Sequence, residues 1–402
     1  MEPITIGLFL IGALGVLANI AQISEFILDR TNQPGPSPQP GPSPQPIIPI
    51  LPGDNPALLP MVEEPLLLPG RQSNSIYVER PPIETQCYNE ILNPNTALIR
   101  IKGSDKMGKT QLVSRILDKV QEINYRTVYI SFKQAESTVF TEKKQFLQWF
   151  CAIVSRRLDL ENKLADYWDD IYGSNDNCTI YFERYLLAQI NQPIVLVLSE
   201  VELIFPHDNI APDFFGLLRY WYQNINNSEI WKKLKLVLVH STEVYIDLDI
   251  NRSPFNVGIP IELLDFTRDQ ASNLVEQYQL NLDASKIESL MAMVGGHPYL
   301  LTLAFEKIKS GQITVDQVLS TAATEGGIYD DYLQELWSIL KDRTQLFNAM
   351  RQVLDTDNPV GLEKKHRFQL NSMGLVCLKD NKVTIRNNLY REYFCYCFGI
   401  TQ

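Results

Sequence analysis

The sequence has few histidines and lacks the cysteine spacings that bind metals. Its 402 residues include four histidines and six scattered cysteines, without a CxxC pair or an HExxH motif. Protein zinc sites need such ligands at close spacing, so a metalloenzyme of this kind is not expected. The cysteines instead indicate reduced, mostly buried thiols in a reducing compartment.

Positive charge is scarce as well. Lysine and arginine total 36 against 47 acidic residues, which gives a net charge of −11 at pH 7. Non-specific binding to DNA or RNA requires clustered cations that displace counterions from phosphates. Nucleic acid is therefore not the expected partner, although Lys364–Arg367 forms one compact basic run.

Charge is absent from most of the N-terminal segment. No charged residue occurs from Pro3 to Ser24, and Ile4–Leu17 is almost wholly apolar. About twenty helical residues span the roughly 30 Å hydrocarbon core of a bilayer, so residues 1–30 are expected to form a single transmembrane anchor. A cleaved signal peptide is disfavoured because Glu2 stands where a basic residue is usual and no A-x-A cleavage site follows. A buried helix of a soluble domain is the other alternative.

A proline-rich linker follows at residues 31–72. Within it, Pro34–Pro46 repeats the unit Pro-Gly-Pro-Ser-Pro-Gln. Proline removes backbone donors and favours extended polyproline II, so this stretch is interpreted as a spacer, with a PxxP ligand as the alternative. The folded part is expected from about residue 73.

A phosphate-binding loop is the most specific motif of the sequence. Gly103–Thr110 reads Gly-Ser-Asp-Lys-Met-Gly-Lys-Thr and matches GxxxxGK[ST] at every required position. Thr96–Ile101 before it predicts a strand, and Gln111–Ile123 after it has helical periodicity, which is the context of a true P-loop. In such loops backbone N–H groups and the helix N-terminus hold the phosphates of ATP.

The residues of this loop have separate expected roles. Lys109 is expected to reach the β- and γ-phosphates, and the Thr110 hydroxyl to ligate Mg²⁺. Residues that line the loop are also expected to contact the nucleotide: Gly103, Ser104, Asp105, Lys106, Met107, Gly108, and Gln111 at the start of the helix. The predicted cofactors are therefore ATP and Mg²⁺.

Strands and helices alternate after the loop. The sequence predicts further strands at Thr127–Phe132, Pro193–Glu200, Leu234–His240 and Val257–Leu263, and helices at Gln145–Leu158 and Cys178–Gln189. Unbroken apolar runs are typical of strands buried on both faces of a parallel sheet. Residues 73–263 are thus expected to form an α/β P-loop NTPase core with a doubly wound, mostly parallel sheet.

The position of a Walker B motif is unusual. The apolar strand before Ser199 ends in Ser199-Glu200, where a P-loop ATPase normally has two acidic residues. Glu200 is the candidate catalytic residue that orients the attacking water, and Glu202 follows two residues later. Ser199 can hydrogen-bond near a magnesium-bound water but carries no charge, so weak Mg²⁺ retention and slow hydrolysis are expected. The alternative is that Glu200 merely ends a strand.

Two polar positions are weaker candidates for sensing the γ-phosphate. Ser241 or Thr242 follows the Leu234–His240 strand, where this class of NTPase has a polar sensor; a hydrogen-bonded turn explains them equally well. Arg219 is a candidate phosphate-sensing arginine, although a solvated or salt-bridged arginine is the favoured interpretation.

Several segments together resemble the AAA-like family of signal-transduction (STAND-type) P-loop ATPases, found chiefly in bacteria. These segments are Tyr77–Glu84, Met107–Thr110, Asp213–Arg219, His240–Tyr245, Ser253–Gly258 and Met293–Tyr299.

The resemblance implies a lid and a C-terminal domain. It places Tyr77, Val78 and Arg80 against the adenine and Pro298 at the start of a helix in a helical lid over residues 264–330. Thr267 is a plausible N-cap at the opening of this lid. Residues 331–402, with a hairpin at Val376–Ile385, resemble a winged helix. The family has an acidic residue at the position of Ser199 and an aspartate near that of Glu202.

Three functions remain in competition. The preferred one is a membrane-anchored, ATP-dependent switch for signalling or assembly, with its folded part in the cytoplasm because an ATP site must face ATP. The second is a non-hydrolysing ATP-binding scaffold, which Ser199 favours. The third is a DNA-associated AAA regulator, supported mainly by Lys364–Arg367. Expected partners are ATP, a membrane and an unidentified protein, with homo-oligomerisation as a further alternative.

Overall fold

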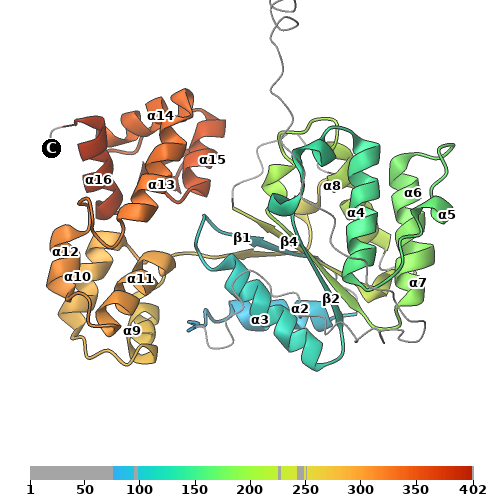
Figure 1. Ribbon diagram of the computed structural model, residues 1–402, viewed down its shortest axis with the longest axis horizontal. Helices are drawn as coiled ribbons and strands as arrows, with labels where there is room; N and C mark the ends of the chain where they lie inside the picture. The colour runs from blue at the N-terminus through green and yellow to red at the C-terminus, as the bar shows by residue number, and fades with distance from the viewer. Residues whose placement is uncertain (1–75, 95–97, 225–227, 242–248, 250, 401–402) are drawn as a thin grey trace, which may run out of the picture. The chain divides into compact units, whose positions relative to one another are not determined.

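Five parallel strands form the centre of the NTPase core (Figure 1). The computed structural model describes residues 76–94, 98–224, 228–241, 249 and 251–400. Its sheet has the order β2-β3-β4-β1-β5, with every neighbouring pair parallel. The strands are β1 (Leu98–Lys102), β2 (Arg126–Ser131), β3 (Ile194–Ser199), β4 (Leu234–His240) and β5 (Ile259–Glu262). The predicted strands are confirmed, with ends that differ by at most two residues.

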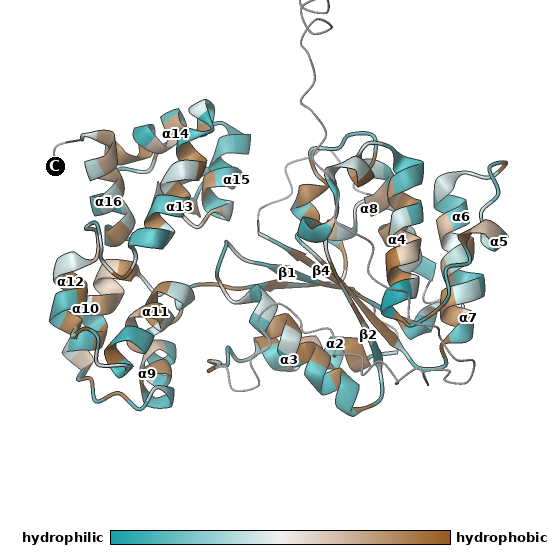
Figure 2. Cartoon of the chain, in the orientation of Figure 1, coloured by the Kyte–Doolittle hydropathy of each residue, from teal (hydrophilic) through white to brown (hydrophobic). Residues whose placement is uncertain are grey.

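Alternate side chains of these strands enter two separate hydrophobic cores. Leu196 and Leu198 of β3 face one cluster, whereas Val195 and Val197 face the other. Because successive strand residues point to opposite faces, a strand buried on both sides must be apolar throughout. The strands are accordingly brown in Figure 2, and the outer faces of the surrounding helices are largely teal.

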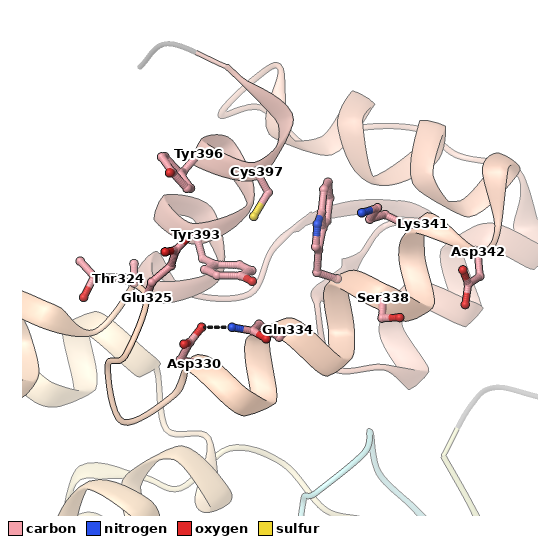
Figure 3. A pocket seen from close by; sticks show the side chains of 12 residues that line it. Thr324, Glu325, Asp330, Gln334, Ser338, Lys341, Asp342, Tyr393, Tyr396 and Cys397 are labelled. Carbon is pink, nitrogen blue, oxygen red and sulfur yellow. Dashed lines mark hydrogen bonds between the residues drawn. The ribbon is translucent and has the colours of Figure 1, made fainter.

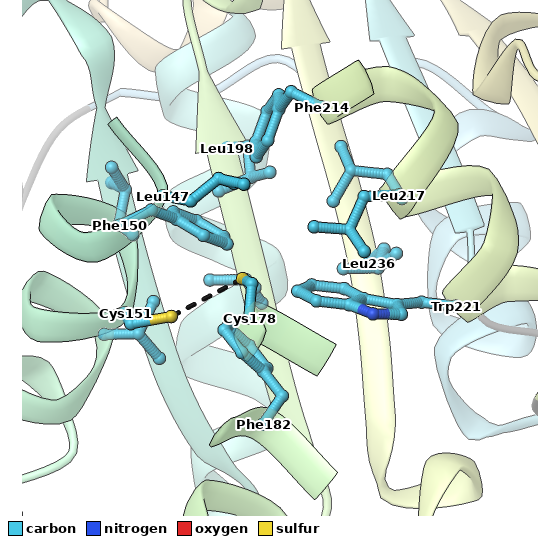
Figure 4. Packing of buried hydrophobic residues seen from close by; sticks show 14 of the residues in the cluster. Leu147, Phe150, Cys151, Cys178, Phe182, Leu198, Phe214, Leu217, Trp221 and Leu236 are labelled. Carbon is cyan, nitrogen blue, oxygen red and sulfur yellow. Dashed lines mark hydrogen bonds between the residues drawn. The ribbon is translucent and has the colours of Figure 1, made fainter. Parts of the chain in front are cut away.

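Helices cover both faces of the sheet, as the doubly wound prediction requires. One layer contains α2 (Ile83–Leu92) and α3 (Lys109–Glu122); the other contains α4 (Lys143–Arg157), α6 (Ser174–Tyr181) and α8 (Ala211–Asn224) (Figure 1). Aromatic side chains fill the second layer, where Trp221 packs on Phe182 with ring centroids 4.4 Å apart (Figure 4).

The helix predicted at Cys178–Gln189 is wrong in its extent and regularity. Helix α6 begins four residues earlier, at Ser174, and is followed by a π-helical turn, Phe182–Leu186, and the short α7 (Leu187–Gln189). The first turn of α6 is polar, so the sequence has no apolar period there that would indicate the start of the helix. In the structure the buried Asn177 donates to the carbonyl oxygens of Asp169 and Tyr172, which ties α6 to the loop after α5 (Leu164–Tyr167).

Four helices follow the sheet. They are α9 (Arg268–Gln277), α10 (Ala284–Val294), α11 (Pro298–Lys309) and α12 (Val315–Thr321). The predicted N-cap at Thr267 is confirmed, and it forms a capping box with Gln270. Pro298 is the first residue of α11, a position at which its missing N–H is no loss.

The C-terminal part contains the predicted hairpin. Helices α13 (Asp330–Lys341), α14 (Thr344–Leu354) and α15 (Lys364–Ser372) precede the antiparallel strands β6 (Val376–Lys379) and β7 (Lys382–Ile385), and α16 (Asn388–Phe398) follows. A single hydrophobic cluster extends from α9 to α16.

The predicted anchor at residues 1–30 and linker at residues 31–72 lie outside the described residues. Within the described ranges, no helix combines the length and apolar character needed to cross a membrane. All described residues belong to one unit that spans Glu64–Gln402.

Candidate nucleotide-binding site

Two glycines allow the chain to turn sharply between β1 and α3. The Gly103 N–H donates to the His240 carbonyl oxygen at 3.3 Å, and a β-carbon at Gly103 would lie 3.1 Å from that of Leu263. Gly108 is the N-cap of α3 with φ +91°, a conformation that L side chains rarely adopt. A β-carbon at Gly108 would also lie 3.2 Å from Arg80 Nη2. The loop therefore needs glycine at both ends.

The Lys109 ammonium lies inside the loop. Its Nζ donates to the carbonyl oxygens of Gly103 at 2.7 Å and Ser104 at 2.8 Å. Burial lowers the pKa of Lys109, while the nearby carboxylates of Asp105, Glu202 and Glu200 act in the opposite direction. The loop thus holds a partly desolvated cation next to its own backbone, as phosphate binding requires.

Two carboxylates extend from the turn after β3. Glu200 has a left-handed backbone, with φ 57°, and the 3-10 turn Val201–Leu203 follows it directly. This turn brings both Glu200 and Glu202 to the cleft that contains Lys109. The Oε2 atoms of both glutamates are buried and have no hydrogen-bond partner among the described residues.

Glu202 is held by the end of the neighbouring strand. Its Oε1 accepts hydrogen bonds from the Ser241 N–H at 3.1 Å and from the Ser241 hydroxyl. Burial raises the pKa of Glu202, while the hydrogen bonds from Ser241 and the charge of Lys109 oppose that rise. Ser241, predicted as a phosphate sensor, is therefore bonded to a carboxylate in the cleft. Thr242, the alternative sensor, lies outside the described residues.

The cleft above the loop has a volume of about 660 Å³, which is in the range of small-molecule sites. Its lining contains many of the predicted site residues: Val78, Asp105, Lys106, Met107, Gly108, Lys109, Thr110, Gln111, Glu200, Ser241 and Pro298. Gly103, Ser104 and Ser199 do not line it. Ser199 is buried at the end of β3, with 4% of its surface exposed.

Tyr77 and Arg80 have other contacts than the predicted adenine. Tyr77 lines a separate cleft, and its hydroxyl donates to Glu84 at 2.7 Å. Arg80 Nη2 donates to the Met107 carbonyl oxygen at 2.9 Å, and its guanidinium lies 4.7 Å from the Phe266 ring centroid. Arg80 therefore stabilises the backbone of the P-loop through its hydrogen bond to Met107. Of this segment, the structure brings Ile76 and Val78 to the nucleotide cleft.

Arg219 lies outside the nucleotide cleft. Its Nη1 is 3.4 Å from Asn256 Oδ1, on the side of the core where α8 packs. The favoured interpretation from the sequence is a solvated or salt-bridged arginine; in the structure Arg219 hydrogen-bonds Asn256 and does not line the nucleotide cleft.

The C-terminal part contacts three successive residues of the P-loop. Arg386 Nη1 donates to the Ser104 hydroxyl at 3.2 Å, and the Asp105 N–H donates to the Ser372 carbonyl oxygen at 2.7 Å. Lys106 Nζ lies 3.4 Å from Glu335 Oε2 and 4.0 Å from the Tyr332 ring centroid. The loop is therefore enclosed by α13, α15 and the hairpin.

Sequence reasoning missed several residues of this site. The missed cleft residues lie after β2 or in the helical and C-terminal parts: Lys133, Phe266, Tyr299, Thr302, Tyr332, Glu335 and Arg343. Apart from Tyr299, which ends the Met293–Tyr299 segment of the family resemblance, none belongs to a local motif, because each reaches the cleft through tertiary folding. Two residues had a usable signal: Tyr299 in that segment, and Glu202 in its position two residues after Glu200.

A second, larger cleft lies apart from the P-loop. Its volume is about 860 Å³, and it is lined by residues of α13 and α16, including Trp337, Tyr393 and Cys397 (Figure 3). It contains no residue that the sequence predicted for the nucleotide, so the smaller cleft remains the candidate site.

The residues of the nucleotide cleft fit a magnesium ion. Mg²⁺ prefers oxygen ligands and retains several waters when it binds with phosphates. The cleft offers the Thr110 hydroxyl and the buried, unpaired Oε2 atoms of Glu200 and Glu202. Such oxygens are costly to bury without a partner, and a cation would satisfy them.

Comparison with known proteins agrees with this loop, sheet and cleft. Residues 69–396 match the AAA-like domain family, so the chain belongs to that family of P-loop ATPases. A search of curated protein sequences finds no match.

Two solved structures are among those that match this chain. One is a signal transduction ATPase with numerous domains (STAND) from Pyrococcus horikoshii, which has a tetratricopeptide repeat sensor; its identity is 15% and its TM-score 0.41. That match covers 80% of this chain but only 42% of the other, so this chain spans less than half of it. The Aeropyrum pernix ORC2 protein has 13% identity and a TM-score of 0.48, covering 82% of this chain and 96% of that one.

Proposed function

We propose that this chain binds Mg²⁺ and ATP in the cleft above Gly103–Thr110 and acts as a nucleotide-dependent switch for signalling or assembly. The observation that carries the proposal is the presence in one cleft of Lys109, inside the loop, and of two glutamates whose buried Oε2 atoms have no partner in the described part of the chain. A cation and two free carboxylate oxygens in one cleft match the needs of a magnesium-bound triphosphate.

The residues of the cleft have distinct tasks in this proposal. Lys109 exchanges its hydrogen bonds to the Gly103 and Ser104 carbonyl oxygens for bonds to phosphate oxygens. Thr110, the second residue of α3, presents its hydroxyl to the magnesium ion. Glu200 accepts a hydrogen bond from the attacking water and orients it. Bound Mg²⁺ would supply the positive charge that neutralises the phosphates.

Contacts between the P-loop and the C-terminal part supply the switch. Ser104, Asp105 and Lys106 bond to Arg386, Ser372 and Glu335 respectively. A γ-phosphate can shift this arrangement only through different contacts in the two states. Because the same loop would bind the phosphates, ATP binding and the enclosure by α13, α15 and the hairpin are coupled. We interpret residues 264–330 as a lid and residues 331–402 as a winged helix.

Hydrolysis of ATP to ADP and phosphate is expected to be slow. Ser199 is neutral and buried at the end of β3, and it does not line the cleft. The second candidate function is therefore an ATP-binding scaffold without turnover.

We also propose that residues 1–30 tether this part of the chain to a membrane on the cytoplasmic side. Co-sedimentation of the protein with vesicles, lost on deletion of residues 1–30, would support this tether.

Single-turnover hydrolysis by the full-length protein separates the switch from the scaffold. A slow rate that Glu200→Gln abolishes, with ATP affinity retained, supports a switch. Binding without any turnover, with turnover gained in Ser199→Asp, supports the scaffold. Failure to bind ATP at all contradicts both functions.

A further inference from the structure

Ser199 supplies no negative charge to a magnesium ion, and it does not line the cleft. It ends the fully buried strand β3, and its backbone pairs in register with Ser131 of β2 and Val239 of β4. A neutral hydroxyl at this buried position cannot replace a carboxylate as a counter-charge. Another residue must provide this charge if the cleft retains Mg²⁺.

Glu202 has the geometry of such a replacement. Two donors of Ser241 fix its Oε1, so the carboxylate cannot rotate freely, and this leaves Oε2 available. That Oε2 atom is buried and has no partner among the residues that the structure describes. The backbone turn at Glu200 and the 3-10 turn after it carry Glu202 from the end of β3 back over the cleft.

Lys109, a cation of the cleft whose charge acts on Glu202, does not satisfy that carboxylate. The Lys109 ammonium donates to the carbonyl oxygens of Gly103 and Ser104. It also acts on Glu202 only as a nearby charge, without a direct ion pair among the described contacts. A buried carboxylate in this position gains from a proton or from a second cation.

We propose that Glu202, held by Ser241, supplies through Oε2 the carboxylate that retains Mg²⁺ in this chain, in place of Ser199. The inference rests on the proposed ATP site. It divides the work between the two glutamates: Glu202, anchored to the end of β4, belongs to the coordination shell of the ion, and Glu200 orients water. Glu202 reaches the ion directly or through one of its waters, which are arrangements that Mg²⁺ accepts equally.

Mg²⁺ dependence of nucleotide affinity tests the inference without any turnover. A fluorescent, non-hydrolysable ATP analogue is titrated into the full-length protein in excess Mg²⁺ and again in EDTA. The ratio of the two Kd values reports how strongly Mg²⁺ is retained. Glu202→Gln keeps the shape and the bond from Ser241 but removes the charge, so the ratio is expected to fall by about tenfold or more. The Kd in EDTA should stay the same or improve slightly.

Matched variants distinguish a specific loss of Mg²⁺ retention from a non-specific effect of the substitution on the structure. Glu229→Gln removes an exposed carboxylate that pairs with Lys232, and it should leave the ratio unchanged. Ser241→Ala removes the hydroxyl donor to Glu202 Oε1 and keeps the backbone N–H donor, so it should lower the ratio by a smaller factor. It provides a test even if Glu202→Gln fails to fold. Ser199→Asp added to Glu202→Gln should restore the ratio, because it returns the carboxylate to the end of β3.

The outcomes are distinguishable. An unchanged ratio in Glu202→Gln, or in Ser241→Ala if only that variant folds, overturns the inference while ATP binding stands. A wild-type protein that binds the analogue equally well with and without Mg²⁺ also overturns it. A wild-type protein that binds no nucleotide in either condition refutes the proposed function, and the inference with it.

Discussion

The guanidinium of Arg386 joins the carboxylate of Asp265 to the hydroxyl of Ser104. Its Nη2 and Nε lie 3.2 and 3.3 Å from the two Asp265 oxygens, and its Nη1 donates to Ser104 Oγ at 3.2 Å. Ser104 and Arg386 are 282 positions apart in the sequence. A paired, nearly buried arginine that directly follows β7 therefore contacts the P-loop itself.

Replacement of Arg386 by alanine should destabilise the protein and loosen the P-loop. The Arg386 side chain is only 9% exposed, and its loss leaves Asp265 without its bidentate partner. We expect the free energy of unfolding in urea to fall by about 1–3 kcal/mol. Arg391→Ala is the control: its pair with the exposed Asp357 is worth less than about 1 kcal/mol. Equal losses in the two variants would contradict a structural role for the Arg386 contact.

Gly108→Ala should distort the P-loop. It forces an alanine into φ +91° and places a β-carbon 3.2 Å from Arg80 Nη2. The strained backbone costs about 1–3 kcal/mol, so a lower melting temperature and weaker ATP binding are expected. Gly361→Ala is the matched control, because a β-carbon there meets nothing within 4 Å. An unchanged melting temperature in Gly108→Ala would show that the loop adapts without cost.

The buried His297 should make the folded state sensitive to acid. Its side chain is fully buried with neither ring nitrogen bonded among the described residues, and burial lowers its pKa to about 3, with Arg386 and Lys106 adding to the effect. In the unfolded chain the His297 imidazole therefore binds a proton near pH 6.5, whereas in the folded chain it stays neutral until the pH approaches 3. The neutral His297 therefore makes a contribution to the free energy of unfolding that is complete above pH 6.5 and is lost as the pH falls towards 3.

Urea unfolding at pH 7 and pH 5 measures the contribution of His297. From the two pKa values, this residue alone should lower the free energy of unfolding by roughly 2 kcal/mol between these pH values. His297→Gln should reduce the pH dependence by that amount. The same pH dependence in wild type and His297→Gln would count against a neutral, buried histidine.

Cysteine labelling should reach few thiols in the native protein. Cys87, Cys151, Cys178 and Cys395 are buried, and burial raises the pKa of Cys87 to about 12. The Sγ atoms of Cys151 and Cys178 lie 3.4 Å apart in the aromatic core (Figure 4). Burial also raises the pKa of Cys377 and Cys397, but these two thiols are partly exposed, so brief iodoacetamide treatment should modify one of them first. Mass spectrometry that finds native Cys151 or Cys178 labelled would contradict this packing, and urea should expose all six.

Local patterns were sufficient to predict the sheet and the loop. Three features are determined within a few residues of sequence: the unbroken apolar runs of β3 and β4, the loop Gly103–Thr110 and the N-cap at Thr267. The wrong start of α6 has a local cause too, because Ser174–Asn177 is polar and gives no apolar period. Its anchoring bond to Asp169 is visible only in the folded chain.

The contacts around the P-loop could not be predicted in the same way. Arg386, Ser372 and Glu335 reach the loop from elements that begin more than two hundred residues later, and their sequence surroundings resemble any solvated segment. The same holds for Arg80, which the family resemblance placed against the adenine but which hydrogen-bonds the Met107 carbonyl oxygen. Such contacts depend on tertiary packing, and no short motif encodes them.

ATP binding by the full-length protein tests the central claim most directly. Isothermal titration with a non-hydrolysable ATP analogue should give saturable binding at one site in the wild type. Lys109→Met removes the ammonium that lies between the Gly103 and Ser104 carbonyl oxygens while it retains most of the side chain, and it should weaken binding by at least about tenfold. Saturable binding that Lys109→Met reduces would support the P-loop as the nucleotide site. No binding by the wild type, or equal binding by both proteins, would contradict it.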